Sequence, residues 1–223
     1  MPMVDILGTL DEKIENNQRL AEKYESLIEL YFDELLQQKN EHWEMSNLTS
    51  IAEYTNGLAM QKFRPKGTEY IPVIKIKELS QGHIDNNTEQ ADPTINSRFI
   101  INDGDVIFAW SGTLMVKLWC GGIGGLNQHL FKVTSNKYPK WFYYLWTKYH
   151  LQRFQSIAQG KAVTMGHIKR EDLSKSIVDI PTKELFEMYD LLIEPFLEKI
   201  IALRIENRKI NELKAVYLKK FFG

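Results

Sequence analysis

The sequence has little of what disulfides, metal sites and membrane spans require. Its 223 residues include one cysteine, Cys120, and five scattered histidines, so neither a disulfide within the chain nor a histidine set with zinc-ligand spacing is available. No run approaches the roughly 18 uninterrupted apolar residues of a membrane-spanning helix, and the first residues combine no basic stretch with an apolar one. These absences predict a cytoplasmic protein that binds no metal and enters no membrane.

Motifs for nucleotide binding are also missing. The segment 156–170, SIAQGKAVTMGHIKR, centres on Gly160 and Lys161, but glutamine stands where a Walker A loop needs its first glycine, and alanine where it needs Ser or Thr. The second glycine cluster, GGIGGLNQ at 121–128, has Asn127 in place of the third glycine of the dinucleotide fingerprint. We expect a tight turn between strands at the second cluster.

Catalytic motifs are equally absent. The seven prolines never occur in pairs, which excludes the proline-rich loop that holds the target amine in amino-methyltransferases, and WSGT at 110–113 is not a nucleophile elbow. Asp103 and Asp105 lack the Glu-x-Lys partner of a metal-dependent nuclease, so NDGD at 102–105 is interpreted as a hairpin turn. Cys120 has no obvious partner base. We therefore expect no catalysis by this chain.

Acidic residues are missing from Val106 to Arg170, a stretch that carries nine Lys or Arg and three of the histidines. The net charge of the whole chain is −1, so any basic character is local. Buried strands would also exclude acids, and that alternative stays open. Lysines are hard to bury, however, and the interpretation we favour is a positive surface that follows the phosphates of a nucleic acid.

Both ends of the chain have apolar residues at helical spacing, over 7–38 and again over 182–222. The two segments resemble each other at an offset of 190, which aligns Asn17 with Asn207 on otherwise apolar stripes. A buried asparagine at such a position typically sets the register of a helix pair. A duplicated helix is one explanation and a chance match of two amphipathic helices the other. The residues expected to pack between the helices are Leu10, Asn17, Leu20, Ile28, Ile200, Asn207, Ile210 and Tyr217.

The middle of the chain has a different residue pattern. Alternating or β-branched runs at 70–79, 98–110 and 129–135 predict strands. A helix with an aromatic face is predicted over 139–158. The expected fold class is therefore α+β: one mixed α/β globular domain flanked by two long helices that pack as an antiparallel coiled coil. The expected divisions are an N-terminal helix over 1–40, the globular domain over 41–181 and a C-terminal helix over 182–223.

This order of helix, globule and helix resembles the DNA specificity subunit of type I restriction-modification systems. The segments that carry the resemblance are LGTLDEKIENNQRL, YIPVIKIKELSQGHI, INDGDVIFAWSGTL, LNQHLF and QGKAVTMGHIKREDLSKSIVDIP, in that order along nearly the whole chain. The family's full subunit carries two target-recognition domains, whereas this chain has one globule and resembles the second half. The resemblance implies a homodimer, or pairing with another specificity half.

By this resemblance, the globule is a target-recognition domain that binds double-stranded DNA and reads one half of a bipartite target. Methyltransferase (M) subunits would methylate adenine with S-adenosylmethionine bound to them, and a restriction (R) subunit would cleave; this chain itself needs no cofactor. Polar side chains at loop tips would read base edges and cations would hold phosphates. The DNA-binding candidates are Gln61, Lys62, Arg64, Ser111, Thr113, Asn127, Gln128, Lys161, Thr164, Lys169 and Arg170.

The alternative from another functional class is a non-catalytic scaffold or regulator whose helices recruit partners and whose globule binds protein or RNA. Salt-sensitive adsorption to heparin or duplex DNA distinguishes the two, because a pure protein scaffold would show none.

Overall fold

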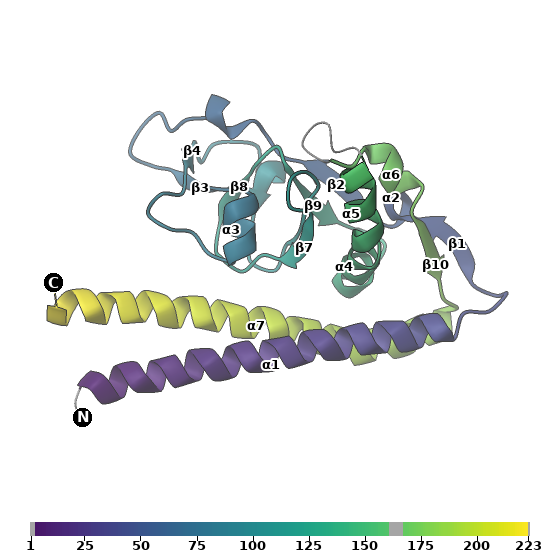
Figure 1. Cartoon of the computed structure of the whole chain (residues 1–223), viewed down its shortest axis with the longest axis horizontal. Helices are drawn as coiled ribbons and strands as arrows, with labels where there is room; N and C mark the ends of the chain where they lie inside the picture. Colours follow the sequence, from purple (N-terminus) through teal and green to yellow (C-terminus); the bar gives the residue numbers. More distant parts are fainter. Residues whose placement is uncertain (1–2, 161–166, 223) are drawn as a thin grey trace.

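The structure is a computed structural model that describes residues 3–160 and 167–222. Two long helices, α1 (Met3–Gln37) and α7 (Lys183–Phe222), run antiparallel and side by side, with both ends of the chain at the same end of the pair (Figure 1). The expected coiled coil is confirmed. Pro195 lies inside α7, which continues through it.

Apolar stripes hold the two helices together, and Ile28 and Ile200 are fully buried between them and the globule. Leu10, Ile210 and Tyr217 are half-buried. Leu20 was expected in this seam, but its side chain is 38% exposed and Ala21, 3% exposed, takes the inward position. Helical geometry explains the correction. Ala21 follows Asn17 by four residues and precedes Ile28 by seven, so these three lie on the buried face of the helix and Leu20 lies beside it.

A four-stranded antiparallel sheet forms the centre of the globule, in the order β2-β9-β6-β7. Its strands are β2 (Glu53–Asn56), β9 (Leu130–Thr134), β6 (Val106–Ala109) and β7 (Met115–Leu118). All four residues of β6 are buried, because Val106 and Phe108 face one hydrophobic core while Ile107 and Ala109 face another. The sheet is thus covered on both sides.

A second sheet, in the order β4-β3-β8-β5, covers one side of the first. Its strands are β3 (Ile71–Ile74), β4 (Gln90–Ala91), β5 (Ile100–Ile101) and β8 (Gly124–Leu126). The glycine cluster expected as a simple turn therefore contributes a strand, β8, which is parallel to β3. Packing explains why glycine is needed: a Cβ on Gly124 would lie 2.5 Å from the Ile74 side chain, and one on Gly125 would lie 2.9 Å from that of Met60.

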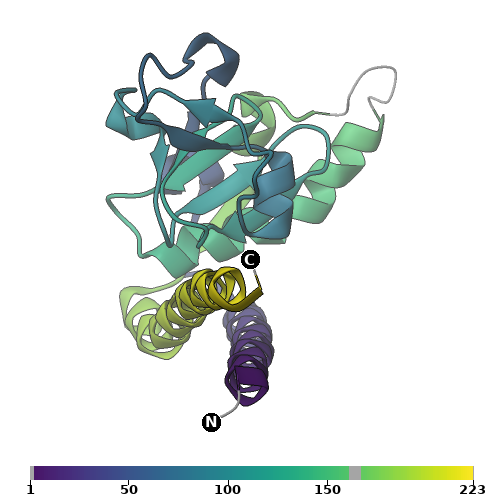
Figure 2. The ribbon, with the colours of Figure 1, turned by 90° about the vertical axis from the view of Figure 1, so that its left-hand side faces the viewer.

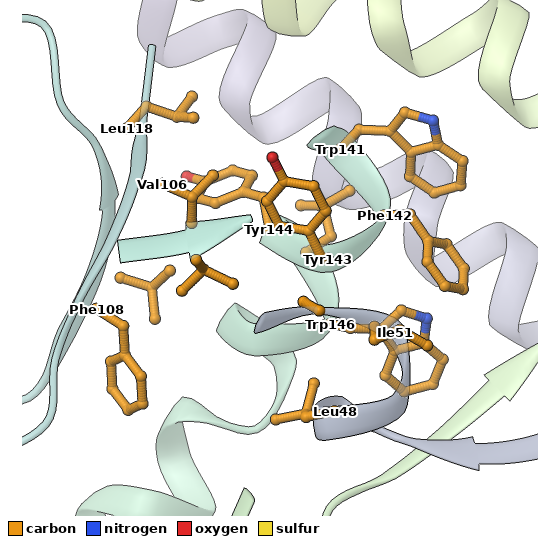
Figure 3. Packing of buried hydrophobic residues seen from close by; sticks show 14 of the residues in the cluster. Leu48, Ile51, Val106, Phe108, Leu118, Trp141, Phe142, Tyr143, Tyr144 and Trp146 are labelled. Carbon is orange, nitrogen blue, oxygen red and sulfur yellow. The ribbon is translucent and has the colours of Figure 1, made fainter. Parts of the chain in front are cut away.

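Helices α4 (Lys140–Tyr149) and α5 (Leu151–Gly160) cover the other side of the central sheet. The aromatic side chains of α4, among them Trp141, Phe142 and Trp146, fill the space between the sheet, α2 (Leu48–Ile51) and the long helices (Figure 3). Seen along the helix pair, the globule lies entirely on one side of it (Figure 2).

The remaining elements are short. They are β1 (Glu44–Asn47) paired antiparallel with β10 (Ile177–Ile180), α3 (Ile76–Gln81), α6 (Arg170–Ser174) and the 3-10 turns η1 (Met60–Lys62) and η2 (Ser97–Phe99). The β1-β10 ribbon joins the globule to the adjacent ends of the long helices (Figure 1).

Three local expectations need correction. NDGD is a turn, but not a hairpin, because β5 before it pairs with β8 while β6 after it pairs with β7 and β9. The strand expected over 70–79 ends at Ile74. Helix α3 begins at Ile76, and the backbone N–H of Lys75, just before it, donates to Glu78 Oε2 at 3.1 Å. The helix expected over 139–158 is divided at His150, whose imidazole is held by the Ile177 carbonyl at 2.7 Å.

Candidate nucleic-acid interface

One edge of the central sheet gathers polar and aromatic side chains from four separate segments. Antiparallel pairing sets Ala109 opposite Leu130 and Asn56 opposite Phe131. The ends of β2 and β6 therefore meet the start of β9. Asn56, Trp110 and His129 consequently lie together, although they are far apart in the sequence. We call the side chains of Asn56, Trp110, Ser111, Gln128, His129 and His167 the edge cluster.

Trp110 is at the centre of the edge cluster. Its indole Nε1–H donates a hydrogen bond to Asn56 Oδ1 at 2.9 Å, and its ring stacks on Phe131 with centroids 5.6 Å apart. Its backbone N–H donates to the His129 carbonyl, and its own carbonyl accepts from the Ile168 N–H. The half-buried indole is thus fixed from several sides and offers a rigid apolar surface.

Next to the indole, three side chains form a hydrogen-bonded chain. Ser111 Oγ lies 2.9 Å from His129 Nδ1, and Gln128 Nε2 lies 3.3 Å from His129 Nε2. Ser111 is only 5% exposed, whereas Gln128 and His129 are half-buried. Asn127 is also 5% exposed, and its Oδ1 accepts from the His129 backbone N–H at 3.2 Å. Asn127 therefore shapes the turn, and Gln128 is the member directed toward solvent.

Cationic side chains flank the edge cluster. The guanidinium of Arg170 lies 5.9 Å from the Phe131 ring centroid and donates to the Tyr54 carbonyl at 3.2 Å. Lys169 is exposed, and its backbone N–H is bonded to Asp172 Oδ2 at 2.7 Å. His167 forms a β-bridge with Ser111. The candidates Lys161 and Thr164 lie outside the described residues.

The other candidates lie on neighbouring loops. A β-bridge joins Leu58 to Asn127, which brings the segment with Gln61, Lys62 and Arg64 next to the same edge. Gln61 and Lys62 are exposed, while Arg64 lies 3.8 Å from Glu89. Thr113 is exposed in the turn between β6 and β7. The sequence candidates in the described part of the chain therefore occupy loops and short helical turns around this edge.

Some cations of the acid-free stretch are paired with acids, so only part of the stretch is left for the expected positive surface. Lys132 pairs with Asp105 at 2.7 Å, and Lys148 contacts Glu29 of α1. Both acids come from outside the stretch, so only the fold brings them to these lysines. Among the described residues of the stretch, Lys169 and Arg170 lie near the edge cluster. Lys137 lines an open hollow of about 340 Å³ together with Arg170, Ser50 and Glu53.

At its other end, β6 meets the helix pair. Asp103 Oδ2 lies 2.6 Å from the Arg208 guanidinium of α7, and Asp103 Oδ1 accepts from the Gly122 backbone N–H at 2.8 Å. Arg204 of the same helix pairs with Glu25 at 2.8 Å, which ties the two helices together close by. The edge cluster thus lies at the end of β6 remote from α7.

Sequence reasoning did not select Asn56, Trp110, His129 or Asp103 for these positions. A usable signal for Trp110 and His129 was present, since each adjoins a buried strand and is followed or preceded by polar residues. Their proximity depends on the pairing of β6 with β9, which no local pattern reveals. Among the described residues, no group of three or more His, Cys, Asp or Glu could hold a metal ion, and no helix is long and apolar enough to cross a membrane.

Comparison with known proteins identifies the family. Residues 40–215 match the family model described as the type I restriction modification DNA specificity domain. This chain belongs to that family. The match to the specificity domain covers the whole globule, including both ends of β6 and the edge cluster.

Individual relatives agree with this family. The chain is 21% identical to the type I restriction enzyme MjaIX specificity subunit of Methanocaldococcus jannaschii, over 98% of this chain and 56% of that protein. The crystal structure of a type I restriction-modification system S subunit from M. genitalium has the same fold, with a TM-score of 0.62 and 14% identity, over 98% of this chain and 59% of that one. These relatives are specificity subunits, so the expectation of a non-catalytic chain is confirmed. The chain spans little more than half their length.

Proposed function

We propose that this chain is a DNA-recognition component of a type I restriction-modification complex, and that its globule binds double-stranded DNA and reads one half of a bipartite target. The observation that carries the proposal is the edge cluster, a fixed indole with polar and cationic neighbours at the end of β6 remote from the helices, in a chain of the specificity-domain family. Aromatic, amide and guanidinium groups together supply apolar, base-edge and phosphate contacts.

The helix pair serves a different purpose in this proposal. It separates recognition domains by a fixed distance and provides the surface to which M and R subunits bind. Adenine methylation, with S-adenosylmethionine bound to the M subunits, and cleavage by the R subunit are then activities of the partners in the cytoplasm. The family match supports a DNA-recognition role, and the ion pair of Asp103 with Arg208 supports a fixed orientation of the globule on the pair.

Two recognition domains are needed for a bipartite target, and this chain has one. A homodimer would present two identical domains, and its target would be a gapped palindrome. Pairing with a different specificity half would instead give an asymmetric gapped target.

Methylome sequencing tests the proposal. The chain is expressed in a host together with type I methyltransferase subunits, and the methylated sites are compared with those of the same host lacking the chain. We expect a new adenine-methylated gapped motif that appears only with the chain. Absence of any new motif, despite assembly with the methyltransferase subunits, would refute the proposal and favour a scaffold or regulator.

A further inference from the structure

The polar groups of the edge cluster differ in how much of their hydrogen-bonding capacity is already used. Ser111 and Asn127 are buried, and both are bonded to His129, through its ring and its backbone respectively. The Asn56 carbonyl oxygen is occupied by the Trp110 indole. Gln128 has one amide N–H directed to His129, and within the described residues its Oε1 has no hydrogen-bond partner. Among the described residues, Gln128 is therefore the amide of this cluster that keeps both its acceptor oxygen and one N–H for a ligand.

The tautomer of His129 follows from its two neighbours. The amide nitrogen of Gln128 can only donate, so His129 Nε2, 3.3 Å away, has to accept. A neutral imidazole that accepts at Nε2 carries its proton on Nδ1, and this N–H donates to Ser111 Oγ at 2.9 Å. The chain of bonds from Ser111 through His129 to Gln128 consequently fixes which way the amide is turned.

An amide held in this way presents one acceptor and one donor to solvent, Oε1 and the second N–H of Gln128. In the major groove only adenine offers the matching pair on one base, a donor at N6 and an acceptor at N7. Guanine offers two acceptors there, so Oε1 would face O6 without a proton between them. The orientation imposed by His129 therefore selects for adenine.

We propose that Gln128 reads an adenine of the recognised half-site, and that His129, itself held by Ser111, is the positioning residue that orients its amide. This inference rests on the proposed function, because it specifies how the same surface discriminates bases. Neighbouring Trp110 and Arg170 contribute apolar and phosphate contacts, whereas Gln128 contributes sequence preference at one position.

The test begins from the methylated motif of the wild-type chain with its methyltransferase partners. Gln128→Ala is expected to make one adenine of the half-site degenerate and to leave every other position unchanged. Binding of purified complex to four duplexes that differ at this position should show the wild-type preference for adenine, roughly tenfold or more, collapse toward equality. Gln18→Ala is the matched control, since Gln18 is an exposed amide on α1 that bonds Glu22, and its motif should be unaltered.

A second variant tests the positioning role. His129→Phe keeps an aromatic ring but removes both nitrogens, so the adenine preference should fall while affinity for unrelated duplex DNA stays within about twofold of wild type. A merely structural role would lower both affinities together. Circular dichroism of each variant checks that the fold is retained.

Three results would overturn the inference. An unchanged motif in Gln128→Ala would refute it and leave the proposed function standing. Loss of a base other than adenine would also refute it. A wild-type chain that gives no motif at all would refute the proposed function, and this inference with it.

Discussion

Asn17 and Asn207 face each other across the helix pair, with Asn17 Nδ2 2.9 Å from Asn207 Oδ1. Asn17 also donates to Glu206, and Asn207 Nδ2 donates to the Ile14 carbonyl at 3.0 Å. The offset of 190 that aligns the two helices in sequence equates these same two residues. In an antiparallel pair, a residue that contacts its own equivalent lies next to the local twofold axis. The sequence match and the contact thus describe one centre of pseudo-symmetry.

Replacing one asparagine should destabilise the helix pair, because the partner amide is left with unsatisfied groups. We expect Asn17→Leu to lower the free energy of unfolding by about 1–3 kcal/mol in urea denaturation. The double variant with Asn207→Leu should recover most of this loss, since both polar groups are then replaced by apolar ones. A double variant no more stable than Asn17→Leu would contradict this account of the contact.

The ion pair between Asp103 and Arg208 should contribute to the attachment of the globule to α7. Its side chains are 27% and 28% exposed, and Asp103 also accepts from the Gly122 N–H. We expect Asp103→Asn to cost about 1–3 kcal/mol of unfolding free energy. The control is Lys175→Ala, which breaks an exposed pair with Glu171 and should change stability by less than about 0.5 kcal/mol. If both variants lost the same unfolding free energy, the pair of Asp103 with Arg208 would contribute no more than an exposed surface pair.

Cys120 should be unreactive in the folded protein. Burial raises the pKa of its thiol to about 11, with smaller opposing contributions that include the positive charge of Arg204. Because the thiolate is the reactive form, almost none is present at pH 8. Labelling with iodoacetamide at pH 8 should be negligible in buffer and complete in denaturing urea. Rapid labelling of the folded chain would mean that the loop around Cys120 opens readily.

Glu194 should make stability depend on pH. Burial raises the pKa of its carboxyl, and the nearby charges of Glu198 and Asp190 raise it further, although Lys140 lowers it. A raised pKa in the folded state means that stability is fully present below the ordinary value near 4.5 and falls as pH rises through the raised one. Glu194→Gln should therefore stabilise the chain at pH 7 and have little effect at pH 4, as measured by urea denaturation. An equal effect at both values would exclude ionisation as the cause.

Lys169 should contact a DNA phosphate if the proposed surface is correct. Lys169→Ala is expected to weaken binding to all duplex sequences alike and to reduce the slope of log affinity against log salt by about 0.9. The control is Lys183→Ala at the start of α7, where the lysine pairs with Glu187 and the slope should not change. An unaltered slope in Lys169→Ala would remove this residue from the interface.

The two long helices were determined by the sequence alone. The apolar residues in 7–38 and 182–222 recur with a period of 3.6. This period places their side chains on one face of a helix, which is then buried. The strand at 129–135 was predictable from its β-branched and alternating residues, and the helix that starts after Pro139 from its aromatic face. Which individual residue enters the seam was less certain, and Ala21 rather than Leu20 does so.

Only the tertiary structure decided which distant segments meet. NDGD looked like a hairpin because turn residues between two strands are locally the same whether the strands pair with each other or with other partners. The acid-free stretch looked basic because its counter-charges, Asp105 and Glu29, lie outside it in sequence. The edge cluster exists because β6 pairs with β9, which places Ser111 beside His129. Strand pairing is a choice among non-local partners, and its free energy comes from cores that form only when the whole chain has folded.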